Sequence, residues 1–189
     1  MAINKNGQLR IIAGQWRGRK IKFIDQDGLR PTPDRVRETL FSWLQSDVPN
    51  AVCLDLFAGS GALGFEAASR GARRVTLVDS SNQACKMIKE NIMHLQSESI
   101  NVVTSEALRY LTDIHTRYDV VFLDPPYKLN VLSQVFSYLE QKNCLSEHAK
   151  IYFEHDVKQA VPELPDNWHV LKNKTAGQVS YYLIDRTEP

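Results

Sequence analysis

Apolar residues follow two alternating patterns from residue 51 onward. Short, continuous runs rich in β-branched residues are typical of buried parallel strands, and apolar residues at every third or fourth position are typical of helices. The predicted strands are Ala51–Leu56, Val75–Asp79, Asn101–Thr104, Asp119–Leu123 and Lys150–Glu154. The predicted helices are Ala62–Ser69, Asn82–Gln96, Glu106–Asp113 and Leu129–Lys142. This alternation predicts a parallel sheet with helices on both faces.

The carboxyl-terminal part departs from this alternation. Two further predicted strands, Trp168–Lys174 and Val179–Asp185, are joined only by Thr175–Gln178. A connection this short makes a hairpin, so the last strand is expected to run antiparallel to its neighbour.

The amino-terminal part has a different pattern, in which residues 9–23 alternate short apolar pieces with glycine and arginine. This pattern predicts a β-hairpin or an extended arm, with Gly14 and Gly18 supplying the turns. A loop is expected at residues 25–30.

A helix is predicted to begin at Thr32-Pro33-Asp34, with Thr32 as its cap and Pro33 at its first position. Its apolar residues recur at helical spacing, which indicates that one face packs against the body of the protein. Arg35 and Arg37 are expected to lie largely off that face.

Asp124-Pro125-Pro126-Tyr127 directly follows the apolar run Val120–Leu123. Two prolines cannot extend a strand, so the chain is expected to turn at the strand's carboxyl end. In open α/β sheets, ligands bind at that edge. The turn presents a carboxylate, a proline carbonyl and an aromatic ring, which together suit a planar group with an exocyclic amine.

A glycine-rich loop from Asp55 to Gly64 follows the first strand of the sheet and opens a helix. Glycines let the backbone approach a ligand closely, and the start of a helix offers free N–H groups. The loop matches the dinucleotide fingerprint, and Asp79 ends the next strand, where an acid that binds ribose is expected. By itself the loop does not separate NAD from other cofactors that contain adenosine. Asp55 favours S-adenosylmethionine, because its carboxylate would repel a pyrophosphate and attract an ammonium group.

Charge is distributed unevenly along the chain, whose net charge is +1. Residues 1–37 hold nine Lys or Arg against three Asp, a net charge of +6, and residues 38–189 carry −5. A basic segment on an acidic body favours a polyanionic partner such as nucleic acid.

The three cysteines are widely spaced, which argues against a disulfide framework or a zinc site and favours small core residues. The five histidines show no ligand spacing, so no metal is expected, and His155 is expected at the surface. The chain shows neither a signal peptide's apolar core nor an apolar stretch as long as a membrane span, so we expect a cytoplasmic protein with no membrane partner.

These motifs resemble those of the seven-stranded, S-adenosylmethionine-dependent methyltransferases that modify amino groups. More narrowly, residues 10–19, residues 30–41 and Ala176-Gly177-Gln178-Val179 are similar to segments of the bacterial rRNA small-subunit methyltransferase D family. The resemblance covers nearly the whole chain. It implies a Rossmann-like sheet, mostly parallel with an antiparallel last strand, and methyl transfer to the N2 atom of a guanine in 16S ribosomal RNA. The RNA would be free or part of an assembling small ribosomal subunit.

Two parts are expected: a basic RNA-binding extension at residues 1–45 and a methyltransferase domain at residues 46–189. The catalytic candidates are Asp124, Pro125, Pro126 and Tyr127, which would hold the amine and stack on the base. The candidates for binding S-adenosylmethionine are Asp55, Phe57, Ala58, Gly59, Gly61, Asp79, Ser80, Glu106 and Ala107. The candidates for binding nucleic acid are Arg10, Trp16, Arg17, Arg19, Lys20, Arg35 and Arg37.

The residues alone leave several interpretations open. Phe57 and Ala58 could serve packing only, and Ser105 could simply cap the helix that follows it. The same motifs are compatible with an N6-adenine DNA methyltransferase, because relatives that modify adenine also carry Asp-Pro-Pro-Tyr. They are also compatible with a nicotinamide oxidoreductase that uses the same glycine loop, and with a non-catalytic RNA-binding assembly factor that retains the fold.

Overall fold

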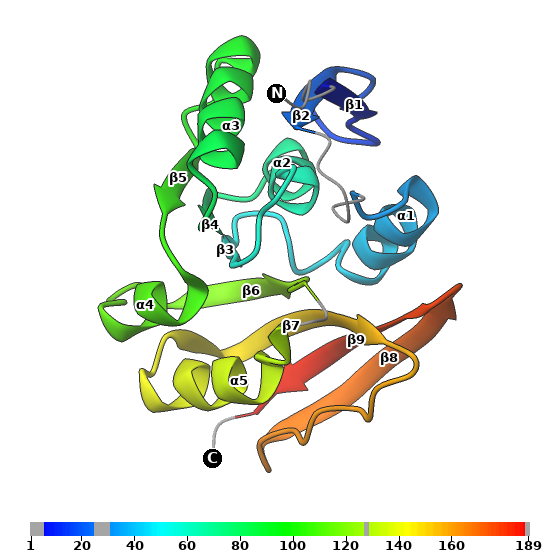
Figure 1. The fold of residues 1–189 in the computed structure, drawn as a ribbon, viewed down its shortest axis with the longest axis vertical. Coiled ribbons are helices and arrows are strands. Elements are labelled where there is room, and N and C mark those ends of the chain that lie inside the picture. The colour runs from blue at the N-terminus through cyan, green and yellow to red at the C-terminus, as the bar shows by residue number, and fades with distance from the viewer. Residues whose placement is uncertain (1–5, 25–30, 127–128, 188–189) are drawn as a thin grey trace, which may run out of the picture.

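A twisted seven-stranded sheet with the strand order β5-β4-β3-β6-β7-β9-β8 forms the centre of the computed structural model, which describes residues 6–24, 31–126 and 129–187 (Figure 1). Its strands are β3 (Val52–Asp55), β4 (Arg74–Asp79), β5 (Ile100–Thr104), β6 (Tyr118–Leu123), β7 (Leu145–Asp156), β8 (Trp168–Ala176) and β9 (Val179–Arg186). The helices are α1 (Asp34–Trp43), α2 (Ala62–Ser69), α3 (Asn82–Leu95), α4 (Ala107–Thr112) and α5 (Leu132–Gln141).

The strand directions confirm the predicted fold. Strands β3 to β7 are parallel to one another, and β9 runs antiparallel to both β7 and β8. The turn between β8 and β9 consists of Gly177 and Gln178 only, because β8 continues to Ala176 rather than ending at Lys174. β9 begins at Val179 as predicted and ends one residue later than predicted, at Arg186. β7 is also longer, since it begins at Leu145 rather than Lys150.

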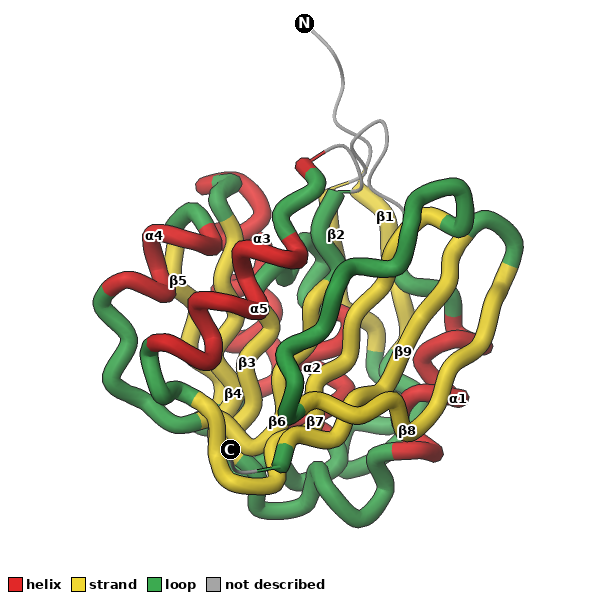
Figure 2. Tube along the Cα trace, turned by 90° about the horizontal axis from the view of Figure 1, so that it is seen from below, coloured by secondary structure: helices red, strands yellow, loops and turns green. Residues whose placement is uncertain are grey.

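Helices cover both faces of the parallel part of the sheet, with α1, α2 and α3 on one side and α4 and α5 on the other, whereas the edge strand β8 is largely exposed (Figures 1 and 2). Side chains of β6 alternate between the two hydrophobic cores: Val120 and Phe122 belong to the first, and Val121 and Leu123 to the second. Burial on both faces explains why β6 has a continuous apolar sequence. All three cysteines are buried and form no disulfide, which confirms the prediction that they are small core residues.

The amino-terminal segment forms the predicted hairpin, with β1 (Asn6–Arg10) antiparallel to β2 (Lys20–Ile24). Gly14 and Gly18 both have φ of 81°, a left-handed conformation that favours glycine. Ile11 and Ile21 are buried in the same core as Phe65 and Leu77, so residues 1–45 and residues 46–189 share one hydrophobic core.

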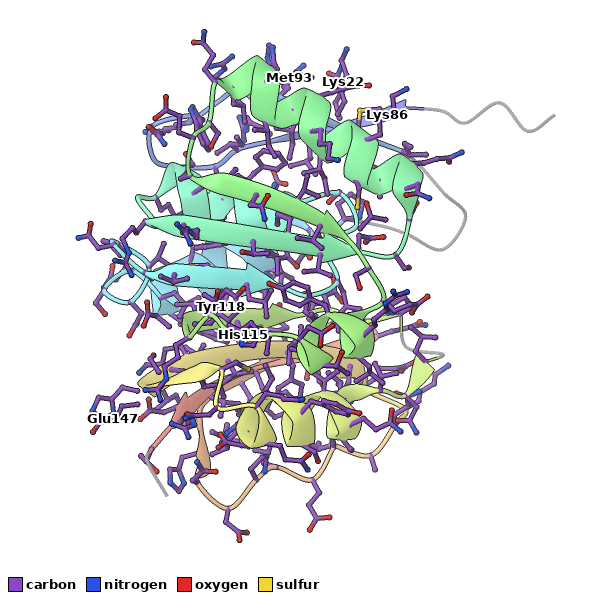
Figure 3. All side chains as sticks on the ribbon, turned by 90° about the vertical axis from the view of Figure 1, so that its left-hand side faces the viewer. Lys22, Lys86, Met93, His115, Tyr118 and Glu147 are labelled. Atoms are coloured by element: carbon purple, nitrogen blue, oxygen red, sulfur yellow. The ribbon has the colours of Figure 1, made fainter. Side chains whose placement is uncertain are left out.

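Polar contacts fasten this hairpin to α2 and α3. The buried carboxylate of Glu66 accepts hydrogen bonds from the backbone N–H groups of Ile12 (2.8 Å) and Ala13 (3.0 Å). The Asn91 side chain accepts the N–H of Lys22 (3.0 Å) and donates to its carbonyl oxygen (2.7 Å). Figure 3 accordingly shows Lys22 lying beside α3. The hairpin is therefore a docked part of the fold rather than a free arm.

The predicted starts of α1 and α4 need correction. Thr32 does not cap α1: the helix begins after Pro33, and no side chain caps it by a hydrogen bond. The Thr32 hydroxyl donates instead to Oδ2 of Asp124, at 3.4 Å. Likewise Ser105 does not cap α4, because the cap position is occupied by Glu106. Within the described residues, none of these helices is long and apolar enough to cross a membrane.

Candidate active site

Three acidic residues gather at the carboxyl ends of three neighbouring strands. Asp55 ends β3, Asp124 follows β6, and Glu154 lies near the end of β7. The register pairs Asp55 with Phe122 and Leu123 with Phe153, so the three acids lie at one edge of the sheet. Among the described residues, no Lys or Arg forms an ion pair with any of them.

Burial changes the ionisation of these acids. Asp55 is only 2% exposed and Glu154 4%, and desolvation, followed by the charge of Asp124, raises the pKa of each carboxyl to about 8. Desolvation also raises the pKa of Asp124, to about 6, although the hydrogen bond from Thr32 opposes this shift. The strand edge is thus an environment that would favour a cationic ligand.

The Asp-Pro-Pro turn lies where it was predicted. β6 ends at Leu123, Asp124 is half-buried, Pro125 is buried and Pro126 is exposed. Tyr127, the fourth residue of the motif, lies outside the described residues. A hollow of about 300 Å³, partly open to solvent, lies beside the turn and is lined by Pro125, Pro126, Asn130, Val131, Leu132, Glu154, His155, Gln159, Ala160 and Pro162.

The glycine loop is held by two of the predicted acids. Oδ2 of Asp55 accepts the N–H of Gly64 at 3.2 Å, and Oδ2 of Asp79 accepts the N–H of Gly59 at 2.7 Å. Gly59 and Gly61 have φ of 50° and 77°, which explains why the turn needs glycine at both positions. Gly64 serves close packing instead, because a Cβ there would overlap the Leu77 side chain.

A second hollow, of about 440 Å³ and also partly open to solvent, adjoins this loop. Its lining combines the loop and the end of β4 with α3 and the hairpin: Phe23, Ile24, Pro31, Gly59, Ser60, Asp79, Ser81, Ala84, Met87 and Ile88. The hairpin therefore forms part of one wall, a role that the sequence patterns did not indicate for Phe23 and Ile24.

The remaining cofactor candidates lie around the same edge. Phe57 is half-buried, Ala58 is buried, and Ser80 is exposed after β4. The N–H of Ser105 donates to the carbonyl oxygen of Asp79 at 3.0 Å, which places the exposed Glu106 and the half-buried Ala107 next to the end of β4. The fold thus brings all the candidates of this set to the carboxyl edge of β3, β4 and β5.

Two of the nucleic-acid candidates are not at the surface. Arg37 is only 1% exposed; its guanidinium lies 2.6 Å from Asp34 and 3.6 Å from Glu66, and it donates to the carbonyl oxygen of Arg10. The expectation that it lies off the packed face is wrong, because it shares that face with Leu40 and Phe41, three and four positions later. Trp16 is buried in the core as well, so it offers no stacking surface. The other candidates, Arg10, Arg17, Arg19, Lys20 and Arg35, are exposed.

His155 also differs from its prediction. It is 4% exposed rather than at the surface, and its ring stacks on Tyr182 with the centroids 5.6 Å apart. The sequence patterns also missed Glu154 and Thr32 as site residues. The one available signal was the position of Glu154 at the end of a predicted parallel strand. In the part of the chain that the structure describes, no three His, Cys, Asp or Glu side chains are arranged to hold a metal ion.

Solved structures of known proteins place this fold in the methyltransferase class. A structure of the Escherichia coli protein yhhF superposes with a TM-score of 0.88 at 41% identity and covers 97% of this chain and 100% of that one. A methylase structure from Haemophilus influenzae gives a TM-score of 0.83 at 41% identity and covers 96% and 100% of the two chains.

Sequence relatives define the family. The family model described as conserved hypothetical protein 95 matches residues 9–185. Ribosomal RNA small subunit methyltransferase D of Escherichia coli K12 is 45% identical over 181 residues, covering 96% of this chain and 91% of that protein. The Haemophilus influenzae protein of the same name is 45% identical over 184 residues and 95% of each chain. The chain belongs to this ribosomal RNA small subunit methyltransferase D family.

Proposed function

We propose that this protein transfers a methyl group from S-adenosylmethionine to the exocyclic N2 of a guanine in small-subunit ribosomal RNA, in the cytoplasm. The family relationship supports the reaction class, since the relatives are named for methyl transfer to that RNA. The observation that carries the proposal is the strand edge with Asp55, Asp124 and Glu154, where no basic partner occurs among the described residues.

The residues present suit S-adenosylmethionine, which carries a positively charged sulfonium and an ammonium group and supplies an activated methyl group when bound. Asp55 would face the ammonium group, and the backbone at Gly59 and Gly61 would line the loop. Asp79 would accept the ribose hydroxyls. Each of its carboxylate oxygens already accepts one backbone N–H, from Gly59 and Ser81, and retains a free lone pair. A strand edge with three acidic side chains is poorly suited to the pyrophosphate of a nicotinamide cofactor, because each acid that ionises repels the phosphates.

The Asp-Pro-Pro turn would hold the amine that receives the methyl group. An aryl amine is a poor nucleophile because its lone pair is delocalised into the ring. Asp124 and the Pro125 carbonyl oxygen would each accept one N–H and stabilise the charge that develops on nitrogen. Positioning of the amine in line with the methyl group would supply much of the acceleration. Stacking on Tyr127 would contribute roughly 1–3 kcal/mol towards holding the base outside its helix.

The exposed cations of the hairpin and α1 supply a surface for the RNA. Arg10, Arg17, Arg19, Lys20 and Arg35 would contact phosphates, and Arg37 and Trp16 have no part in this surface because they are buried.

The decisive experiment is methyl transfer from labelled S-adenosylmethionine to small-subunit RNA from cells that lack this protein, with mapping of the modified base. We expect N2-methylguanine in the RNA, and Asp124→Ala should lose transfer while retaining RNA affinity. Transfer to adenine in DNA, or saturable binding of NADH, would contradict the proposal. If wild type and Asp124→Ala both bind RNA but neither transfers methyl groups, the protein is a non-catalytic assembly factor. Comparing free RNA with partially assembled subunits identifies the form of the substrate.

A further inference from the structure

His155 is a buried polar side chain without a polar partner. It is 4% exposed, and among the described residues neither of its ring nitrogens, Nδ1 and Nε2, has a hydrogen-bond partner. Its ring stacks on Tyr182, with the centroids 5.6 Å apart and the planes inclined by 29°. This stack covers a face of the ring, whereas the nitrogens lie on its edge. A buried donor that is left unpaired costs stability, so the position calls for a functional explanation.

The ring of His155 borders the hollow beside the Asp-Pro-Pro turn. Leu123 of β6 pairs with Phe153 of β7, and both side chains belong to the core under α4 and α5. Pro125 and His155 each follow two residues later, and both line the hollow of about 300 Å³, which is partly open to solvent. The unpaired imidazole and the turn that would hold the amine therefore meet at one hollow.

One edge of guanine suits this pair of groups. A neutral imidazole carries one N–H donor and one acceptor nitrogen. On the Watson–Crick edge of guanine, the acceptor O6 lies two ring positions from the 2-amino group, at about the spacing of neighbouring strands, roughly 4.8 Å. Two ring positions from the 6-amino group of adenine, the same edge carries a C–H group, which accepts no hydrogen bond.

We propose that His155 determines base specificity: its imidazole N–H donates to O6 of the guanine whose 2-amino group is held by the Asp-Pro-Pro turn. This inference rests on the proposed function. Guanine satisfies the donor that the fold leaves unpaired, whereas adenine would leave it buried without an acceptor. A missing acceptor discriminates more strongly than a change of shape in an apolar pocket. His155 thus supplies a selectivity that the turn lacks, because the turn suits the amine of either base.

The test uses short RNA substrates with either guanine or 2-aminopurine at the methylated position. 2-Aminopurine keeps the 2-amino group but has no oxygen at position 6 and no proton on N1. We expect the wild-type kcat/KM to be lower for 2-aminopurine by roughly 10- to 100-fold. His155→Phe keeps a ring against Tyr182 but cannot donate, so kcat/KM for guanine should fall roughly tenfold, while that for 2-aminopurine stays nearly unchanged.

Two further variants serve as controls. His155→Gln retains an N–H donor and should keep part of the preference for guanine. His115→Phe, at an exposed position, should keep all of it. Urea unfolding of His155→Phe tests for a purely structural role: the variant removes the unpaired nitrogens and should be at least as stable as wild type. Lower stability together with equal losses of kcat/KM for both bases would mean that His155 serves packing, which overturns the inference.

The outcome separates this inference from the proposed function. If wild type methylates guanine and His155→Phe keeps the wild-type preference between the two bases, the inference is wrong and the proposed function stands.

A second measurement does not depend on activity. The imidazole signals of His155 in nitrogen-15 NMR, assigned by their absence in His155→Phe, are compared at saturation with the guanine RNA and with the 2-aminopurine RNA. We expect a shift that is specific to guanine, and identical shifts with both RNAs overturn the inference whether or not methyl transfer occurs. If the guanine-specific shift is present but wild type transfers no methyl group, the proposed function fails and the contact between His155 and guanine stands.

Discussion

At the scale of single residues, the same side-chain type serves different purposes within this site. Asp55 and Asp79 both accept backbone N–H groups of the glycine loop, but Asp55 is buried and carries a raised pKa. Gly59 and Gly61 are needed for a left-handed backbone, whereas Gly64 is needed because the helix lies close to Leu77. The chemistry of each residue is thus set by its immediate environment.

The raised pKa of Asp55 predicts that cofactor binding depends on pH. Near neutral pH most of Asp55 is protonated, and a cationic ligand favours the ionised form, so binding should release protons. We expect the Kd of S-adenosylmethionine to fall as pH rises from 6 to 8. Calorimetry in buffers of different ionisation enthalpy measures the proton release. Asp55→Asn should bind more weakly and with less pH dependence, and an unchanged pH profile in this variant would exclude Asp55 as the titrating group.

At the scale of elements, docking of the hairpin on α2 and α3 combines apolar burial with a few buried polar groups. Glu66 is central to it, because its carboxylate accepts two backbone N–H groups of the hairpin and pairs with Arg70 at 2.8 Å. Gly14 permits this approach, since a Cβ there would overlap the carbonyl of Ser69.

Removal of the Glu66 carboxylate should therefore loosen the hairpin. Glu66→Ala leaves the backbone donors of Ile12 and Ala13 without their acceptor and removes the carboxylate that lies 3.6 Å from the buried Arg37 guanidinium. We therefore expect a loss of unfolding free energy of roughly 3–5 kcal/mol. Urea denaturation measures the loss, and hydrogen exchange should show faster exchange in β1 and β2. Glu38→Ala on the exposed side of α1 is the matched control, expected within about 0.5 kcal/mol of wild type. Equal stability of the two variants would contradict this account of docking.

The exposed cations of the hairpin make a separate prediction for RNA affinity. Arg17→Ala removes an exposed charge from the hairpin without changing a buried contact. Each lost phosphate contact should weaken binding and reduce the slope of log affinity against log salt by about 0.7. Fluorescence anisotropy at several salt concentrations measures the slope. Arg109→Ala on α4, on the opposite side of the sheet, serves as the control, and an equal effect of both variants would show that overall charge rather than the hairpin matters.

At the scale of the whole molecule, the site makes the protein less stable as pH rises. Asp55, Asp124 and Glu154 have folded-state pKa values above their ordinary ones, so between about pH 4 and pH 8 the folded state holds more protons than the unfolded state. The free energy of unfolding therefore falls across this window as far as these groups determine it.

Glu154→Gln should remove part of this loss of unfolding free energy at high pH, because the amide has nearly the same volume as the carboxyl and cannot ionise. We expect the variant to gain stability relative to wild type by a few kcal/mol at pH 8 and by much less at pH 5. Urea unfolding at the two pH values provides the comparison. A gain that is equal at both pH values would mean that Glu154 does not ionise in this range.

The sequence by itself determined the alternation of strands and helices, the hairpin with its two glycine turns, and the positions of Asp55, Asp79 and the Asp-Pro-Pro turn at strand ends. These features depend on local periodicity and on the backbone stereochemistry of glycine and proline, which act within a few residues. Only the tertiary structure decided which charges are buried. Arg37 lies beside Glu66, and the Thr32 hydroxyl donates to Asp124, through contacts between segments far apart in the chain. Whether a polar side chain faces water or a buried partner depends on which distant segment the fold packs against it. Local sequence patterns do not predict that segment.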